Sequence, residues 1–261
     1  EWGRAVDPQK VEDALAKNPN IKIVAFVHAE TSTGALSDAK TICEIAHKHD
    51  ALVIVDAVTS LAGSELRVDD WGIDAIYSGT QKCMSCVPGL SPISFGERAI
   101  EKLKARKSKV PSWFLDLNLV MGYWGSGDGK RAYHHTAPVN DLFALHESLS
   151  MLKAEGLENS WKRHTENHEQ LKAGLAKLGI EYLVPADERL PQLNSVFIPE
   201  GVDEAAIRTQ VLNKYGLEIG AGLGALAGKV WRIGLMGYSS RQENIDICLK
   251  ALEEALADNA A

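Results

Sequence analysis

The sequence predicts an α/β fold in which a mostly parallel sheet is flanked by helices, followed by a smaller C-terminal α+β domain. The first observation is a continuous apolar run, residues 51–56, that ends in a carboxylate and is typical of a strand buried on both faces of a parallel sheet. The second is that strand-like and helix-like stretches alternate along the first half, at the spacing of strand–helix–strand units.

The first half of the chain opens with a helix signal. Asp7-Pro8 is typical of an N-cap followed by proline at the first helical position. Ser37-Asp38 provides a similar cap for a second helix. The strand expected over residues 90–95 follows its predecessor through a tight loop, which favours antiparallel pairing. The other elements expected here are strands over residues 21–27, 51–56 and 75–77, a polar loop over residues 28–34, and a helix over residues 97–109.

Two long helices, over residues 139–155 and about 160–178, are predicted to bridge the two domains. We therefore expect residues 1–155 to form part of a large domain and residues 156–261 the small one. Ser240 to Glu243 matches a capping box that opens the last helix. The remaining expectations are strands over residues 195–198, 217–219 and 229–235 and a helix over residues 204–215.

Composition excludes several classes of function. The net charge of −7 is spread without blocks of like charge, so it gives no electrostatic footprint for nucleic acid. No segment approaches the roughly 18 consecutive apolar residues of a membrane span. No signal-like stretch or C-terminal peroxisomal signal is present, so we expect a cytoplasmic location unless a preceding segment directs the protein to an organelle.

Cysteine and histidine spacing predicts no metal site. Cys83 and Cys86 form one C-x-x-C motif without the second pair that a zinc site needs, and a thioredoxin-like role remains an alternative for them. His134 and His135 are adjacent, so they do not share a helical face, and no third ligand is near them in the sequence. Four cysteines in 261 residues are consistent with a reducing compartment.

Lys82 is the first candidate catalytic residue. It follows the strand of residues 75–77 on a turn that begins with the small residues Ser78 and Gly79. A lysine that faces a pocket from such a turn can lose its proton and attack an aldehyde to form a Schiff base. The alternative is an ordinary solvated loop lysine, which is the commoner situation for an isolated lysine.

Asp56 is the expected partner of Lys82. In open α/β sheets ligands bind beyond the carboxyl ends of the strands, and both residues follow such strand ends. A carboxylate facing a pyridine nitrogen, together with a lysine that captures an aldehyde, is the pair that pyridoxal phosphate requires. The alternative interpretation of Asp56 is a helix cap.

Arg232 lies between Trp231 and Ile233 in an apolar stretch. A guanidinium in such a strand needs an anionic partner, and its planar fork suits a carboxylate. That partner is either a substrate carboxylate or an acidic side chain of the protein in a structural ion pair.

Four motifs resemble one known family, the class V aminotransferases of pyridoxal-phosphate fold type I. The resemblance covers the whole chain in register and is closest to the alanine–glyoxylate and serine–pyruvate aminotransferases. The matching motifs are Val55-Asp56-Ala57-Val58, Ser78-Gly-Thr-Gln-Lys82, Tyr133-His-His-Thr136 and Val230-Trp-Arg232-Ile-Gly234.

The resemblance implies a role for each candidate residue. It identifies Lys82 as the Schiff-base lysine and Asp56 as the partner of the pyridine nitrogen. Arg232 matches the arginine that binds the substrate carboxylate. Tyr133 and Thr136 match residues that reach the phosphate bound by the other subunit, which implies a homodimer with shared active sites. The further cofactor contacts implied by the resemblance are Thr31, Val58 and Gln81.

The expected function is therefore amino-group transfer from alanine or serine to glyoxylate or pyruvate. Members of the family carry roughly a further hundred-odd residues ahead of the position of Glu1, in keeping with the size of such folds. We therefore expect the N-terminal part of the large domain to be absent from this chain. A non-catalytic fragment of a larger or split enzyme is accordingly one alternative.

Two other kinds of function are less consistent with the sequence. Class V lyases and desulfurases commonly have histidine before the catalytic lysine, where this chain has Gln81. A dinucleotide-binding domain is disfavoured because the glycine-rich stretch 220–224 precedes a strand-like segment, not a helix.

Overall fold

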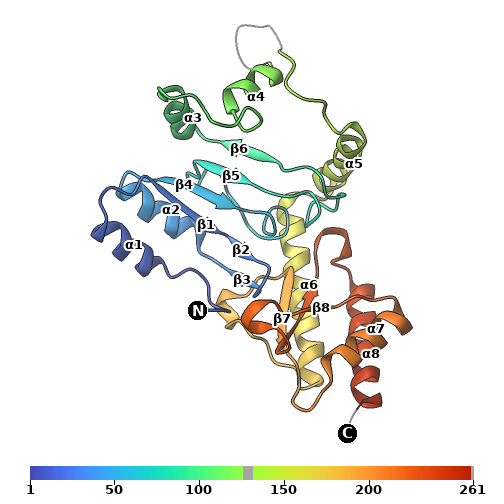
Figure 1. The fold of residues 1–261 in the computed structure, drawn as a ribbon. Coiled ribbons are helices and arrows are strands. Elements are labelled where there is room, and N and C mark those ends of the chain that lie inside the picture. Colours follow the sequence, from blue (N-terminus) through green and yellow to red (C-terminus); the bar gives the residue numbers. More distant parts are fainter. Residues whose placement is uncertain (126–131, 260–261) are drawn as a thin grey trace.

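The computed structural model describes residues 1–125 and 132–259, and its helices and strands are built around three sheets (Figure 1). The largest sheet has the strand order β1–β4–β5–β6. A hairpin of two short strands, β2 and β3, lies beside it, and a second sheet in the C-terminal half has the order β7–β9–β8. The strands of the largest sheet are β1 (Ile23–Val27), β4 (Leu52–Asp56), β5 (Ala75–Tyr77) and β6 (Ile93–Phe95).

The strand directions confirm the predicted, mostly parallel sheet. β4 pairs in parallel with both β1 and β5, and β6 runs antiparallel to β5. The register places Asp56 opposite Val27 on one side and Tyr77 on the other. All three residues end their strands, so the loops that follow them leave from one rim of the sheet.

Helices α1 (Pro8–Lys17) and α2 (Ala39–Lys48) cover one face of this sheet. Both caps follow from local sequence: Asp7 accepts from the Gln9 backbone N–H, and Asp38 accepts from the Thr41 backbone N–H. The covered face contributes buried apolar side chains from alternate strand positions, as a pleated strand requires. These are Val53, Val55 and Ile76, packed with Cys43, Ile45 and Ala46 of α2.

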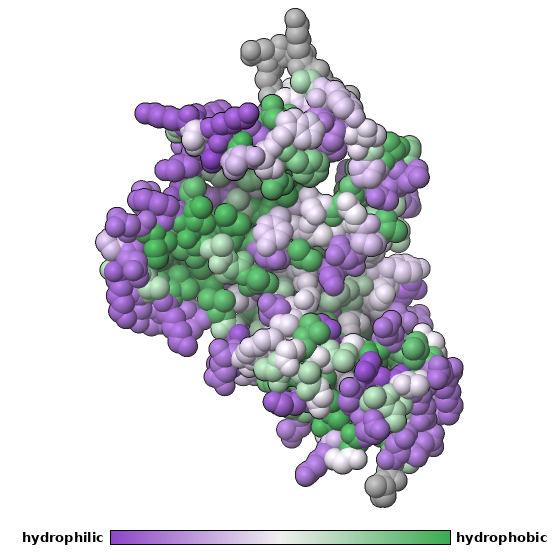
Figure 2. All heavy atoms as spheres, viewed as in Figure 1, coloured by the Kyte–Doolittle hydropathy of each residue, from purple (hydrophilic) through white to green (hydrophobic). Residues whose placement is uncertain are grey.

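The opposite face of the same sheet is apolar and largely open. Ile23 is 51% exposed and Phe95 is 37% exposed. Figure 2 shows apolar side chains gathered on this side of the molecule. A cavity of about 430 Å³ lies between the open face and helices α3 (Glu97–Lys104) and α4 (Leu117–Trp124). Asp56 and Tyr77 belong to this face, because they are in register with each other and alternate with the buried positions.

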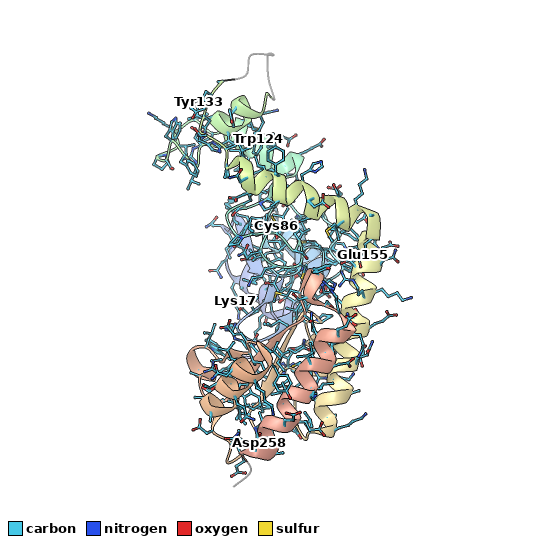
Figure 3. All side chains as sticks on the ribbon, turned by 90° about the vertical axis from the view of Figure 1, so that its right-hand side faces the viewer. Lys17, Cys86, Trp124, Tyr133, Glu155 and Asp258 are labelled. Carbon is cyan, nitrogen blue, oxygen red and sulfur yellow. The ribbon has the colours of Figure 1, made fainter. Side chains whose placement is uncertain are left out.

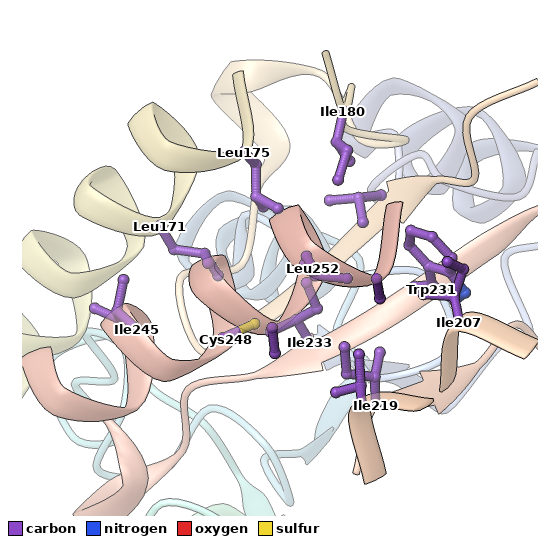
Figure 4. Close-up of a cluster of buried hydrophobic side chains, with 14 of the residues drawn as sticks. Leu171, Leu175, Ile180, Ile207, Ile219, Trp231, Ile233, Ile245, Cys248 and Leu252 are labelled. Atoms are coloured by element: carbon purple, nitrogen blue, oxygen red, sulfur yellow. The ribbon is translucent and has the colours of Figure 1, made fainter. Parts of the chain in front are cut away.

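The C-terminal half packs helices on one antiparallel sheet. Its core contains the side chain of Trp231, which has no exposed surface, together with Leu171, Leu175, Ile207 and Leu252 (Figure 4). The strands are β7 (Leu193–Phe197), β8 (Gly220–Ala221) and β9 (Val230–Gly234). The helices are α6 (Leu157–Lys177), α7 (Glu204–Tyr215) and α8 (Gln242–Asp258).

Two connections join the halves. Helix α5 (Val139–Glu155) is followed by α6 after Gly156, which has φ 87° and ψ 140°, a conformation that glycine alone adopts readily. The hairpin β2 (Ala29–Glu30) and β3 (Ala35–Leu36) lies against the C-terminal half, where the Leu190 backbone N–H donates to the Gly34 carbonyl at 2.8 Å. The predicted domain boundary after residue 155 stays a prediction.

Several local expectations were wrong. The strand expected over residues 90–95 is confined to β6, and the helix expected over residues 97–109 ends at Lys104. The region expected as a polar loop over residues 28–34 contains β2, and the extended segment expected over residues 217–219 is replaced by β8, one residue later.

The predicted capping box of α8 does not form. Arg241 occupies the N-cap position, and its side chain makes no capping hydrogen bond to the first turn of the helix. The Ser240 hydroxyl instead accepts from Nδ2 of Asn167 on α6, at 3.0 Å. Across residues 1–125 and 132–259, no helix is both long and apolar enough to cross a bilayer.

Candidate functional site

The Asp56 carboxylate is held in a defined orientation at the end of β4. Its Oδ1 accepts from the Val58 backbone N–H at 2.9 Å, and its Oδ2 accepts from the Tyr77 hydroxyl at 2.8 Å. The hydrogen bond to Asp56 is the main cause that raises the pKa of Tyr77, with partial burial second. Val58 itself is half-buried at the start of the turn that follows. The carboxylate therefore faces the open side of the sheet with both oxygens anchored.

The ends of β4 and β5 are tied together beyond their last strand residues. The Ala57 backbone N–H donates to the Tyr77 carbonyl at 2.9 Å, and the Ser78 hydroxyl donates to the Ala57 carbonyl at 3.0 Å. On the other side, the His28 backbone N–H donates to the Asp56 carbonyl at 3.0 Å. The loops after β1, β4 and β5 therefore start from one fixed rim.

Lys82 lies on the turn that follows β5. The Ser85 backbone N–H donates to the Lys82 carbonyl at 3.0 Å, and the Cys86 backbone N–H donates to the Thr80 carbonyl at 3.1 Å. The Lys82 side chain is half-buried, and among the described residues no hydrogen bond or ion pair reaches its ammonium group. These bonds fix the Lys82 backbone on the turn that follows β5, while its head group has no partner among the described residues.

Gln81 and Gly79 shape the approach to that turn. Gln81 is exposed, and its Oε1 would lie 2.7 Å from a β-carbon placed on Gly79. A real β-carbon does not approach an oxygen so closely, so Gly79 leaves room for the Gln81 amide to fold back over the turn.

Arg232 is brought together with Thr31 across the two halves of the chain. Its Nε donates to the Ala221 carbonyl at 2.8 Å, and its Nη1 donates to the Thr31 carbonyl at 3.1 Å. No carboxylate of the described residues lies within ion-pair distance of the guanidinium, so the alternative of a structural ion pair is not supported. Two neutral carbonyls fix the group without neutralising it, and its positive charge is available to an external anion.

Tyr133 and Thr136 lie apart from this rim. The Tyr133 hydroxyl and the Thr136 hydroxyl are 2.6 Å apart, and the Tyr133 ring contacts Tyr123 edge to face. Tyr133 is 74% exposed, and Figure 3 places it near α4 at the end of the molecule opposite Asp258. Within one chain the structure does not bring these two residues together with Asp56 and Lys82.

The adjacent histidines are part of an aromatic cluster. The His134 ring stacks on Trp113 with centroids 4.1 Å apart, and its Nε2 lies 3.2 Å from the Trp113 carbonyl. Its Nδ1 faces Nδ1 of His135 at 2.8 Å. The described residues contain no group of three or more histidine, cysteine or carboxylate side chains arranged to hold a metal.

The thiols of the chain are poorly suited to nucleophilic chemistry. All four cysteines are free, and only Cys86 is more than slightly exposed. Burial raises the pKa of Cys83, Cys43 and Cys248 to about 12, which keeps these side chains protonated at neutral pH. Burial of Cys83 disfavours a thioredoxin-like role for the C-x-x-C motif, because the Cys83 thiol is kept from solvent.

Comparison with known proteins places this geometry in a family. Residues 3–247 match the family described as aminotransferase class-V. The chain belongs to the class V aminotransferase family. Alanine–glyoxylate aminotransferase from Callithrix jacchus is 40% identical over 249 residues, which are 95% of this chain and 60% of that protein. (S)-Ureidoglycine–glyoxylate transaminase from Bacillus subtilis is 38% identical, over 98% of this chain and 65% of that protein.

Solved structures agree with this assignment. The crystal structure of an alanine–glyoxylate aminotransferase from Nostoc superimposes with a TM-score of 0.92 at 45% identity, over 98% of this chain and 67% of that one. This class V chain thus spans about 60–65% of the length of the two curated relatives, and its fold is that of pyridoxal-phosphate transferases of fold type I.

Two residues at the rim formed by the ends of β1, β4 and β5 were not identified from the sequence. Tyr77 donates to Asp56, and its only sequence signal is that both residues end neighbouring parallel strands. The His28 backbone N–H donates to the Asp56 carbonyl, and its buried Nδ1 has no hydrogen-bond partner within residues 1–125 and 132–259. Neither contact follows from residue type, because each depends on strand pairing between distant segments.

Proposed function

We propose that the polypeptide carrying this chain is a pyridoxal-phosphate-dependent aminotransferase that uses glyoxylate as an amino acceptor. The observation that carries the proposal is the parallel pairing of β4 and β5. It puts the end of the strand that carries the oriented Asp56 carboxylate beside the end of the strand that leads into the Lys82 turn, which supports the proposal in a chain that belongs to the class V family.

The residues present fit pyridoxal phosphate. A carboxylate with both oxygens anchored suits a protonated pyridine nitrogen, and an amine without a protein partner suits the aldehyde. When bound, the cofactor would supply the electron sink that stabilises negative charge on the substrate α-carbon.

Each side chain then has a defined task. Lys82 would hold the cofactor through Nζ, and its free amine would move a proton at the substrate α-carbon. Asp56 keeps the proton on the pyridine nitrogen. Arg232 grips the substrate carboxylate with its planar fork, which orients the substrate amine toward Lys82. Thr31 and Gln81 are assigned to the cofactor's hydroxyl and phosphate, and Val58 to the face of its ring.

The donor is a small amino compound with a carboxylate. Relatives of similar identity are named for alanine and for (S)-ureidoglycine as donors, and both names carry glyoxylate as the acceptor. We therefore propose glyoxylate as the shared acceptor, with pyruvate as its closest analogue. Alanine or serine is the proposed donor, and the Bacillus subtilis relative makes ureidoglycine the second candidate.

We further propose that the active form is a homodimer with shared sites. Tyr133 and Thr136 are exposed and lie away from Asp56, as expected of residues that serve a neighbouring subunit's phosphate. Large apolar side chains are exposed around the same segment, which favours a protein–protein contact. They are Trp113, Phe114, Leu115, Trp124 and Phe143.

The open face of the β1–β4–β5–β6 sheet is proposed to be covered by further polypeptide. Parallel sheets are found with both faces covered, and Asp56 itself lies on the uncovered face. The chain spans about 60–65% of its curated relatives, so the remaining part of the fold, as a continuation or a separate chain, is the proposed cover. A cofactor seated on Asp56 would then be enclosed between the two parts.

The desulfurase alternative is disfavoured by the cysteines. A desulfurase needs a mobile cysteine that attacks as a thiolate. Cys43, Cys83 and Cys248 are buried with pKa values raised to about 12, and Cys86 lies four residues from Lys82 on the same loop.

Borohydride reduction followed by peptide mapping tests the proposal. The full polypeptide carrying this chain is incubated with pyridoxal phosphate, reduced and digested, and the modified peptide is expected to contain Lys82. A Lys82→Ala variant should show no adduct and almost no transamination. Alanine, serine and ureidoglycine are then compared as donors to glyoxylate and pyruvate. An adduct on another lysine would contradict the assignment, and activity with none of the donors would contradict the substrate class.

A further inference from the structure

The turn that carries Lys82 ends in a strained residue. Ser85 follows Lys82 by three positions and has φ 60°, in the left-handed region that residues with a β-carbon rarely occupy. Its backbone N–H donates to the Lys82 carbonyl at 3.0 Å and closes the turn. Such a conformation persists only where the surrounding structure holds it, and it tends to occur at functional sites.

A short segment from the far end of the sequence holds Ser85. This segment is the 3₁₀ turn η3, Gly237–Ser239, and the Tyr238 backbone N–H donates to the Ser85 hydroxyl oxygen at 2.7 Å. A β-carbon on Gly237 would lie 2.0 Å from Ser85 Oγ and 2.9 Å from the Cys83 carbonyl oxygen. Gly237 also has φ 57°, so glycine alone permits this close approach.

Helix α6 in turn holds η3. The Gly237 backbone N–H donates to Nε2 of His164 at 2.9 Å, while Nδ1 of His164 donates to the Ser160 carbonyl at 2.7 Å. This pair of contacts requires the neutral histidine with its proton on Nδ1. Arg163, paired with Glu155, donates from Nη1 to the carbonyls of Gly237 and Ser240, both at 2.9 Å.

The same part of α6 also binds the turn that follows Asp56. The Ser160 hydroxyl donates to the Ala62 carbonyl at 2.7 Å. Ala62 has φ 71° and, like Ser85, is a residue other than glycine in the left-handed region. Both strained turns of the rim are therefore fastened to one helical turn of α6, which begins beside Glu155 (Figure 3).

We propose that His164 is a positioning residue for Lys82. By accepting the Gly237 N–H it fixes η3, and through Ser85 it fixes the turn that carries the Lys82 amine. The role assigned to Lys82 rests on the proposed function. The turn borders a cavity of about 190 Å³ lined by Cys83, Ser85 and Arg163, which gives it space to move once released. Burial of the ring lowers the pKa of His164 to about 4, so it stays a neutral acceptor at working pH.

A matched pair of variants tests this chain of contacts. His164→Gln can place its side-chain oxygen near the position of Nε2 and keep an acceptor for Gly237. His164→Asn keeps a donor near the position of Nδ1 for Ser160 but cannot reach Gly237. Both variants remove the ring, so they differ mainly in the contact to η3.

The first measurement is the labelling rate of individual cysteines in the full polypeptide carrying this chain. A thiol-specific alkylating reagent is added, and the labelled peptides are identified after digestion. Cys83 is buried next to Gly237 and reports release of the Lys82 turn. Cys43 in α2 and Cys248 in α8 are buried elsewhere and report general unfolding. The second measurement is kcat and KM for transamination.

In His164→Asn, Cys83 is expected to be labelled about tenfold faster than in the wild type. This factor corresponds to about 1.4 kcal/mol less free energy needed to open the turn, while Cys43 and Cys248 should keep the wild-type rate. The kcat of this variant should fall with little change in KM, because Lys82 acts after substrate binding. His164→Gln is expected to remain within about twofold of the wild type in both measurements.

Three results would overturn the proposal. The first is an unchanged Cys83 rate in His164→Asn, and the second is faster labelling of all three cysteines, which is the signature of a merely structural role. The third is a His164→Gln variant as impaired as His164→Asn. Cysteine labelling does not depend on the cofactor, so a wild-type polypeptide without transaminase activity would count against the proposed function separately.

Discussion

Replacing His28 with phenylalanine is expected to make folding stability less sensitive to acid. The His28 ring is 3% exposed and packs edge to face on Trp71, with centroids 5.9 Å apart. Among the described residues its Nδ1 has no hydrogen-bond partner, so no hydrogen bond from that nitrogen stabilises a charged ring. Burial lowers the pKa of His28 from 6.5 to about 4, slightly opposed by the charge of Asp38.

The direction and size of the effect follow from this pKa. The unfolded chain binds a proton near pH 6.5, whereas the folded chain resists protonation of His28 down to about pH 4. Its contribution is therefore complete above pH 6.5 and is lost as the pH falls toward 4. The full difference corresponds to about 3 kcal/mol, of which about 2 kcal/mol is lost by pH 5.

Urea unfolding at pH 8 and pH 5 measures the effect in the full polypeptide. The loss of unfolding free energy between these pH values should be about 2 kcal/mol smaller in His28→Phe than in the wild type. Other groups that destabilise the fold in acid, such as His164 and His168, are present in both proteins and cancel in the comparison. His146→Gln, a change at an exposed position of α5, is the control. If the unfolding free energy falls by the same amount between pH 8 and pH 5 in the wild type and in His28→Phe, the reasoning is refuted.

Three further predictions concern the proposed site. Tyr77→Phe removes the hydrogen bond to Asp56, which at this partly exposed position should weaken cofactor binding about fivefold in an absorbance titration. Unchanged affinity would show that Val58 alone orients the carboxylate. Arg232→Lys keeps the charge but loses the fork, so kcat/KM for alanine should fall about 10- to 100-fold while a donor amine without a carboxylate is unaffected. Equal losses for both donors would contradict a carboxylate-binding role. Heterodimers of Lys82→Ala with a Tyr133→Phe, Thr136→Ala double variant should regain activity, because one of their two sites is intact. Inactive heterodimers of verified composition would mean that each subunit supplies its own residues.

Elements with strong local signals were predictable from the sequence. The apolar run ending at Asp56 gave β4 to within one residue, and the predicted bounds of α5 and α7 are those observed. The Asp7 and Asp38 caps formed as expected because their partners lie two or three residues away. The parallel pairing of β4 and β5 was also as the buried run predicts, whereas the joint role of Asp56 and Lys82 stays a prediction.

The failures occurred where a distant partner displaced a local one. Ser240 matched a capping box, but Asn167, 73 residues earlier in the sequence, takes its hydroxyl instead. The contact of Arg232 with the carbonyl of Thr31, 201 residues away, was likewise not foreseen, while its proposed role toward a substrate carboxylate stays a prediction. Local residue patterns contain no information on either contact, because both depend on how the two halves of the chain pack.

The His164 contact to Gly237 likewise could not be predicted from the sequence. Nothing near His164 or Gly237 in the sequence marks them as partners, and the close approach is visible only once η3 lies against Ser85. The sequence could at most have marked Gly237 as a glycine of unexplained role, but it could not have identified His164 as its partner.

Helix α6 can transmit mechanical displacement from the C-terminal core to the rim. Leu175 is fully buried in that core, while His164 lies eleven residues earlier on the same helix, about 16 Å away along its axis. A tilt of about 3° about Leu175 would move His164 by about 0.8 Å, enough to break a hydrogen bond of ordinary length. Cavity-forming substitutions deep in the C-terminal core can therefore displace the rim without touching any residue of the proposed site.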